Sequence, residues 1–294
     1  MQAWWRSMTP DRAARAQRLG PYFEVQLQLA RRMAELRNEP LSRAVLRYTN
    51  FHRRFALRTP PETPTEPWIS FADSLDRLGD LDDQVALTQA TFLVMAEEIL
   101  PPPPKLAFGC FAHDPPDENG EVQIHFNNAD TDTLGGPLAS EKQTRRRADL
   151  VAMVQDIHAR HPDARAIRGR SWLYNLEAYR RLFPADYAAS ATPEPGVINL
   201  HGNSSWGQMI DSREAVRPEF RATLLANLAD IDPEAPWRAF PLQVLRVTAP
   251  MTEANDPRIV RSETETTDPQ AADAFTEHPP LVIEDPRLES SPPM

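Results

Sequence analysis

Proline is the residue that most constrains how this chain can fold. The sequence holds thirty prolines and only ten glycines in 294 residues, whereas an average chain has more glycine than proline. Because proline lacks a backbone N–H and fixes its own φ, each proline cluster is expected to end a helix or a strand. The chain is therefore predicted to fold from short elements. The clusters lie at residues 60–67, 101–104, 115–116 and 279–293.

Apolar content and cysteine content narrow the class of protein. Hydrophobic residues make up 41% of the chain, which is enough for a sizeable core. No apolar run approaches the roughly 18 residues of a membrane helix, and residues 1–10 lack the apolar run of a secretory signal. The single cysteine, Cys110, excludes an intrachain disulfide framework and fits a reducing compartment. We therefore expect a soluble, cytoplasmic protein without a membrane partner.

The net charge of -10 is unevenly distributed along the chain. Residues 1–58 hold twelve arginines against four acidic residues, a net charge of +8, while residues 253–294 hold ten acidic residues against three arginines, a net charge of -7. A basic segment can bind nucleic acid, but the chain as a whole is acidic and its thirty arginines against two lysines indicate a general compositional bias. No nucleic-acid partner is expected.

Three regions are predicted from these patterns. Residues 1–104 form a helical region, in which Thr9-Pro10-Asp11 starts a helix, apolar residues recur every three or four positions after Pro21, and a third helix runs over 41–55. Residues 105–250 form an α/β (α+β) domain with a mixed sheet and flanking helices. Residues 251–294 form an acidic, proline-rich and mostly disordered tail.

The second region alternates strands and helices. A β-hairpin is predicted first, and in its second strand Val122, Ile124 and Phe126 alternate with polar residues, which predicts one buried and one polar face. A polar loop and a capping box at 140–143 then start a helix that runs to about His161. Strands are expected at 106–113, 121–127, 164–168, 197–200 and 242–247, and a further helix from Pro218.

Two histidines of the hairpin are the best candidates for metal ligands. If the turn centres on Asn119, His113 and His125 lie opposite each other. Further ligands for zinc or iron could come from Asp114, Asp130 or Asp132 and, from a later loop, His201. The spacing matches no known ligand signature, and a shift of one residue in register separates the pair. Surface histidines are the simpler interpretation, so no metal is expected, and a metal-dependent hydrolase is the third functional alternative.

Other catalytic classes find little support. Cys110 and His113 are separated by an odd number of residues on a strand and so point to opposite faces, which favours an inert buried thiol over a nucleophile. No serine lies in a G-x-S-x-G elbow. Gly135-Gly136 lacks both the G-x-G-x-x-G pattern and the lysine of a phosphate-binding loop.

The loop around these glycines nevertheless predicts an anion site of another kind. A strand, a polar loop with two glycines and a helix start aim backbone N–H groups and a helix dipole at one point, which suits a pyrophosphate. At least one of the three arginines at 145–147 could reach such a ligand, although a solvated basic face is the simpler interpretation of these residues.

The order of elements over residues 105–247 resembles part of the GNAT acyltransferase superfamily: helices, a hairpin, a glycine-containing loop into a helix, a strand, a helix and closing strands. The stretches 123–126, 136–138 and 171–173 are similar to those of bacterial acyltransferase-like proteins. The resemblance implies transfer of an acyl group from acyl-CoA, as co-substrate, to a small-molecule amine. It implies that the pyrophosphate is held by Gly135, Gly136, Leu138, Ser140 and Arg145.

For catalysis the resemblance implies a base that deprotonates the amine and a tyrosine that protonates the CoA thiolate. His125 is the candidate base, because it lies on the polar hairpin face near the loop, and Tyr174 or Tyr179 the candidate acid. Core packing is the alternative role for the tyrosines. The adjacent glycines and Pro137, which lacks an N–H, depart from the family's loop pattern. The second functional alternative is therefore a non-catalytic protein of the same fold that binds a ligand or partner.

Overall fold

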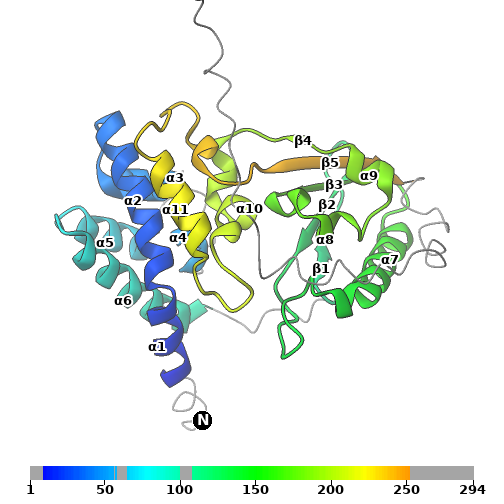
Figure 1. Ribbon diagram of the computed structural model, residues 1–294, viewed down its shortest axis with the longest axis horizontal. Helices are drawn as coiled ribbons and strands as arrows, with labels where there is room; N and C mark the ends of the chain where they lie inside the picture. The colour runs from blue at the N-terminus through cyan, green and yellow to red at the C-terminus, as the bar shows by residue number, and fades with distance from the viewer. Residues whose placement is uncertain (1–8, 56, 58–64, 100–107, 252–294) are drawn as a thin grey trace, which may run out of the picture. The chain divides into compact units, whose positions relative to one another are not determined.

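The chain is an α/β protein with a five-stranded mixed sheet, flanking helices and an N-terminal helical region, as predicted. The computed structural model describes residues 9–55, 57, 65–99 and 108–251 (Figure 1). All of them belong to the first of two compact units, residues 1–256. The predicted tail lies outside the described residues except for Met251, as does the start of the first predicted strand. None of the helices in the described ranges is long and apolar enough to cross a membrane.

Six helices make up the first part of the chain, and prolines begin several helices as well as ending others. Pro21 and Pro67 lie in the first turns of α2 and α5, where a missing N–H costs no hydrogen bond. The helices are α1 (Thr9–Arg18), α2 (Gly20–Arg37), α3 (Leu41–Tyr48), α4 (Phe51–Arg54), α5 (Glu66–Leu75) and α6 (Leu81–Ile99).

The single helix predicted over 41–55 is wrong, because the chain breaks between α3 and α4. Thr49 is extended at the break, with φ −123°. Its hydroxyl donates to Val45 O at 2.7 Å and accepts from the N–H of Phe51 at 3.3 Å, so one side chain serves both helix ends. A threonine that bonds nearby backbone groups competes with helix continuation in this way.

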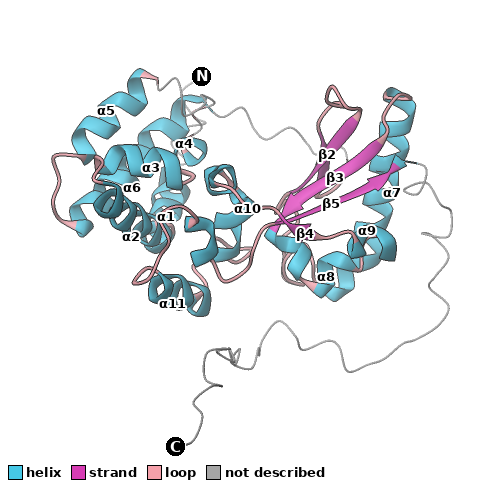
Figure 2. Cartoon of the chain, turned by 90° about the horizontal axis from the view of Figure 1, so that it is seen from above, coloured by secondary structure: helices cyan, strands magenta, loops and turns pink. Residues whose placement is uncertain are grey.

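The sheet has the order β1-β2-β3-β5-β4 (Figure 2). β1 and β2 are antiparallel, β2 and β3 are parallel, and β5 runs antiparallel to both β3 and β4. Helix α7 (Gln143–Arg160) makes the crossover that parallel strands require. The strands are β1 (Phe111–His113), β2 (Glu121–Phe126), β3 (Ala166–Ser171), β4 (Thr192–Pro193) and β5 (Leu245–Pro250).

Short helices follow β3 and connect the remaining strands. α8 and α9, with α7, cover the apolar face of the sheet (Figure 2). The elements are η2 (Trp172–Asn175), α8 (Glu177–Arg180), α9 (Ala185–Ala189), η3 (Val197–His201), α10 (Asn203–Trp206), η4 (Gly207–Met209), α11 (Pro218–Asn227) and η5 (Pro236–Ala239).

Two local predictions are corrected. Residues 197–200 form the 3-10 helix η3 and not a strand; Gly196 precedes it at φ +137°, and the Asn199 side chain closes the turn by donating to Glu194 O at 2.6 Å. The capping box at 140–143 does not form, because Ser140 starts a separate 3-10 turn, η1 (Ser140–Lys142), and its hydroxyl bonds Glu141 at 3.1 Å.

The buried apolar residues form two clusters. The first joins α1–α6 with residues 200–240, including the fully buried Trp206 and Leu224. The second lies between the sheet and α7–α9. The division at residue 104 stays a prediction, but the core of the helical region is completed by a segment that the sequence analysis assigned to the following domain.

Gly169 of β3 allows the second cluster to pack against the sheet. A Cβ atom at this position would lie 1.7 Å from the Tyr174 hydroxyl oxygen and 2.8 Å from that of Tyr187. The two hydroxyls are bonded to each other at 2.9 Å. Only a residue without a side chain therefore fits between the strand and this tyrosine pair.

We predict that Gly169→Ala lowers the free energy of unfolding by about 1–3 kcal/mol, the usual cost of an extra group in a packed core. Gly79→Ala is the matched control, since a Cβ at Gly79 meets no atom of a described residue within 4 Å, and it should change stability by less than about 0.5 kcal/mol. Urea unfolding of both variants measures the difference. Equal stabilities would contradict the packing role of Gly169.

Candidate functional site

The parallel strands β2 and β3 separate before either strand ends. Their pairing runs from Glu121 opposite Ala166 to Ile124 opposite Gly169. β2 then continues through Phe126 and β3 through Ser171 with no pair between them. We call this segment, residues 125–126 and 170–171, the strand fork.

Backbone groups of β2 point into the strand fork. Asp114 N–H donates to Gln123 O at 2.9 Å, so the backbone N–H and C=O of Gln123 point toward β1. Because the backbone N–H and C=O groups of successive residues point to opposite sides of a strand, those of Ile124 and Phe126 point toward β3. The Phe126 N–H lies beyond the last β2–β3 pair and is thus available at the strand fork.

His125 lies on the polar face of the sheet at the strand fork. Its neighbours Ile124 and, to a lesser degree, Phe126 are buried on the opposite face, as the alternation predicts. The Nε2 of His125 lies 2.8 Å from Asp114 Oδ2, and both side chains are about half exposed. A carboxylate in this position fixes the orientation of the imidazole, which is what a general base requires.

The predicted pairing of His113 with His125 is wrong by one residue. His113 pairs with Ile124, while Ala112 is opposite His125, so the two histidines point to different faces of the hairpin. His113 Nε2 lies 3.3 Å from Asp156 of α7 instead. His201 Nε2 contacts Arg47 O at 2.9 Å, in the helical region. Within the described ranges, no group of three or more metal-ligating side chains is found.

Tyr174 and Tyr179 lie together on the other face of the sheet, with ring centroids 5.0 Å apart. Tyr179 borders the strand fork, because its ring lies 5.1 Å from that of Phe126. Burial raises the pKa of both hydroxyls, so both are protonated at neutral pH. They therefore belong to the aromatic core, and their raised pKa values make them hydrogen-bond donors and weak acids.

The glycine loop is closed by its own contacts. Gly135 N–H donates to Asp132 O and Gly135 O accepts from Asp132 N–H, at 3.2 and 3.1 Å. A Cβ at Gly136 would lie 2.9 Å from the Cβ of Ser212. Leu138 is buried in the core of the sheet domain. These residues shape the loop, and the Gly135 N–H is not free for an anion.

Two cations that start α7 are buried and already paired. Lys142 Nζ donates to Asp130 O at 2.8 Å and to Gly135 O at 3.1 Å, and it lies 2.9 Å from Asp132 Oδ1. Arg146 is fully buried and lies 2.8 Å from Asp130 Oδ2 and 3.2 Å from Asp149 Oδ2. We call Lys142, Arg146 and these three aspartates the buried ion cluster.

Arg145 is the predicted ligand residue that remains accessible beside the loop. Its side chain is 63% exposed, and its guanidinium lies at 3.4 Å from Asp130, a weak contact. Ser140 is exposed as well and contacts Glu141. Of the predicted ligand residues, Arg145 and Ser140 therefore present exposed side chains at the start of α7, while the glycines and Leu138 serve the fold.

Cys110 is buried, as expected, and its thiol contacts the Arg146 guanidinium. Burial raises the pKa of the Cys110 thiol. The positive charge of Arg146 lowers this pKa, but by less, so the net shift is upward. A protonated, enclosed thiol is a poor nucleophile. The predicted inert role of Cys110 agrees with this environment.

Two roles were not predicted from the sequence: Asp114 as the carboxylate that orients His125, and Lys142 as the residue that anchors the glycine loop. Asp114 follows the first hairpin strand directly, so its closeness to His125 depends on the register of the hairpin. Lys142 is one of two lysines in the chain. That rarity was the available signal, since a residue type that occurs twice beside thirty arginines indicates a specific role.

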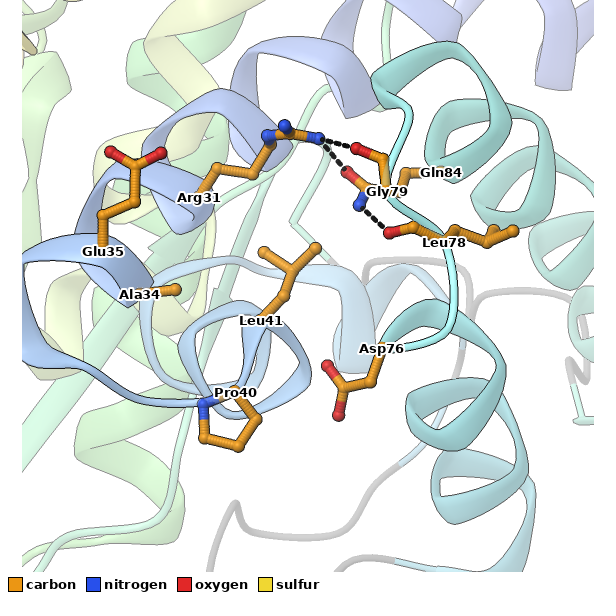
Figure 3. Close-up of a pocket in the computed structure, with 9 residues that line it drawn as sticks. All are labelled: Arg31, Ala34, Glu35, Pro40, Leu41, Asp76, Leu78, Gly79 and Gln84. Carbon is orange, nitrogen blue, oxygen red and sulfur yellow. Dashed lines mark hydrogen bonds between the residues drawn. The ribbon is translucent and has the colours of Figure 1, made fainter.

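A separate surface pocket lies between α2, the start of α3 and the turn from α5 to α6 (Figure 3). Its volume is about 490 Å³, and Leu41 forms its floor. The guanidinium of Arg31 donates hydrogen bonds to Gly79 O and Gln84 Oε1, both at 3.0 Å. None of the predicted site residues lines this pocket.

His52 of α4 and His201 of η3 form a contact between two histidine rings. Their rings meet edge to face at 5.9 Å. His52 is 6% exposed. Burial, together with the charges of Arg53 and His201, lowers its pKa from 6.5 to about 4, so His52 is neutral in the folded state at neutral pH.

We predict that Arg146→Leu is strongly destabilising and Arg145→Gln is not. Removing the Arg146 guanidinium leaves Asp130 and Asp149 without their buried partner, which costs about 3–5 kcal/mol in comparable buried pairs. Replacing the exposed Arg145 should change stability by less than about 0.5 kcal/mol. Urea unfolding tests this pair; a small effect of Arg146→Leu would show that the cluster is dispensable.

We also predict a pH dependence of stability from His52. Between pH 6.5 and about 4 the unfolded chain binds a proton at this position that the folded chain does not, so stability falls as the pH decreases through this window. The loss is about 1–2 kcal/mol after allowance for solvent screening. His52→Gln should remove this part of the slope, and the exposed His158→Gln should keep it. The measurement is the urea unfolding midpoint of the unmodified chain and of both variants at pH 4.5 and pH 7. An identical change of midpoint between the two pH values in all three proteins would refute the role of His52.

No protein-family model, curated protein or solved structure matches this chain. The resemblance to the GNAT superfamily therefore rests on the order of elements and on the local stretches described above. The function of the chain has to be inferred from the geometry of the strand fork and the groups around it.

Proposed function

We propose that the chain transfers an acyl group from acyl-CoA to an amine. The observation that carries this proposal is the strand fork, where two parallel strands separate with a His125–Asp114 pair on one face and Tyr179 on the other. The order hairpin, glycine loop, helix, parallel strand and closing strands also agrees with the order that the resemblance implies.

In this proposal the thioester lies across the strand fork. The amine approaches from the polar face, where His125 accepts a proton from its nitrogen, and Asp114 holds the imidazole in place. The nitrogen then bonds the thioester carbon. The Phe126 N–H is directed toward β3 and donates to the carbonyl oxygen, where negative charge develops.

The leaving group departs on the opposite face. When the carbon–sulfur bond breaks, Tyr179 donates a hydrogen bond to the departing sulfur. Burial raises the pKa of the Tyr179 hydroxyl above that of a thiol, so CoA leaves as the thiolate and takes its proton from solvent. His125 and Tyr179 thus act from opposite faces of one sheet. This arrangement suits a reaction in which nucleophile and leaving group are on different sides of the reacting carbon.

Arg145 and Ser140 are the residues at the start of α7 that hold the CoA phosphates in this proposal. Both are exposed, whereas Lys142 and Arg146 are committed to aspartates. The helix dipole at the start of the 18-residue α7 adds to the attraction for an anion.

The closed glycine loop favours the alternative, a non-catalytic binding protein of the same fold. Lys142 donates a hydrogen bond to the Gly135 carbonyl, and the Gly135 N–H donates to Asp132 O. The loop therefore offers fewer free N–H donors than a pyrophosphate site needs. Such a protein would bind a ligand at the strand fork without turnover. The two functions differ in acyl transfer and share the binding surface.

We predict that acetyl-CoA raises the unfolding temperature of the protein, since a ligand at a hundred times its dissociation constant stabilises the fold by about 2.7 kcal/mol. Arg145→Gln should weaken this effect without changing the unliganded stability. In a screen of amines, thiol release should fall by about 10²–10⁴-fold in His125→Gln, while His158→Gln keeps full activity.

Free CoA and acetyl-CoA are compared in the same experiment. Binding of both without thiol release from any amine would favour the non-catalytic alternative. Absence of a thermal shift with either compound would refute CoA binding, and with it the acyltransferase proposal.

A further inference from the structure

Arg53 of α4 and Arg170 of β3 come close together through α10. Helix α10 packs against β3, and its N-terminal residue Asn203 accepts a hydrogen bond from Asn50, just before α4, at 3.3 Å. The position of a Cβ on Gly202 would lie 3.5 Å from the guanidinium carbon of Arg53. The two arginines thus reach the same surface from elements more than one hundred residues apart in sequence.

These two guanidinium groups differ from their neighbours in having no paired acid. Neither forms a hydrogen bond or an ion pair within 4 Å with any residue in the described ranges, although both are exposed. Arg168, two residues earlier on the same strand, lies 2.7 Å from Glu121 and 3.2 Å from Gln123. The chain therefore pairs one arginine of β3 and leaves the other open.

The electrostatics of Arg170 point in the same direction. Desolvation is the main cause that lowers the pKa of Arg170. The charge of Glu194 opposes it, and the smaller repulsions of Arg168 and Arg53 add to the lowering. Several cations close together repel one another, and a bound anion relieves that repulsion. Next to Arg53, the buried His52 adds an Nδ1 atom without a hydrogen-bond partner among the described residues.

We propose that Arg53 and Arg170 form a binding site for the carboxylate or phosphate group of a small molecule. Guanidinium groups bind both anions with two parallel hydrogen bonds. Arg170 is the first residue of β3 beyond the last β2–β3 pair, and it lies at the strand fork with His125. Resting on the proposed function, this position assigns the anion to the acceptor: an amine whose other end carries a carboxylate or phosphate.

Inorganic phosphate is the first probe, and thermal unfolding is followed at constant ionic strength with sodium chloride as the balancing salt. We expect a saturable rise in unfolding temperature. Because a charged hydrogen bond contributes about 1.5–3 kcal/mol, Arg53→Gln and Arg170→Gln should each weaken the apparent affinity by about tenfold or more.

Arg180→Gln is the matched control, since Arg180 is exposed but lies 3.3 Å from Glu177, and it should bind phosphate as the unmodified chain does. A non-saturable response to phosphate, or equal affinity in all three variants, would overturn the site. Intrinsic fluorescence of the variants without phosphate verifies that each is folded.

Free CoA distinguishes the two possible sources of the anion, because CoA carries phosphates of its own. If the site belongs to the acceptor, the dissociation constant for phosphate stays the same at saturating CoA. Competition between CoA and phosphate would overturn the assignment to the acceptor. The phosphate experiment needs no acyl transfer, so failure of the anion site and failure of the acyltransferase proposal give different results.

Discussion

The contact between Arg146 and Asp130 connects the parts of the molecule on which the candidate site depends. Arg146 lies in the first turn of α7, Asp130 in the loop that follows β2, and Cys110, which the guanidinium also contacts, directly before β1. A fully buried guanidinium is stable only when charges and hydrogen-bond acceptors surround it. The hairpin, the loop and the helix are therefore held in one arrangement, and the position of the strand fork follows from it.

The same use of arginine explains the basic N-terminal region. The Glu214 carboxylate lies 2.6 Å from Arg15 and 3.2 Å from Arg54. The backbone of Glu214 has a positive φ of 65°, in a turn that precedes α11. Burial of Glu214 raises its pKa, but the two arginines more than compensate and the net shift is downward. Further arginines of α2 donate to backbone carbonyls of residues 228–233. Arg15, Arg32, Arg37 and Arg54 thus fasten the helices of the N-terminal region to residues 214–233.

Arginines without an acidic partner contrast with these paired ones. Arg53 and Arg170 are two exposed arginines that no described acid contacts within 4 Å, and the charge of each is felt by the other. Arg145 is a weaker case, since its contact with Asp130 is long and its side chain is mostly exposed. The buried cations hold the fold, and the exposed Arg53, Arg170 and Arg145 are the residues that we propose contact anionic ligands.

Periodicity and residue chemistry in the sequence determined the mixed α/β class, the apolar face of α2, the alternation of β2 and the burial of Cys110, because these features depend on neighbours along the chain. Tertiary structure decided the register of the hairpin, which separates His113 from His125. It also decided the break at Thr49, the 3-10 helix at 197–201 and the sharing of the helical core with residues 200–240. Local patterns cannot determine these features, since a one-residue shift in pairing or a contact between distant segments leaves the pattern along the chain unchanged. The strand fork is of this second kind: it exists only because β2 and β3, forty residues apart, pair at four positions and then part.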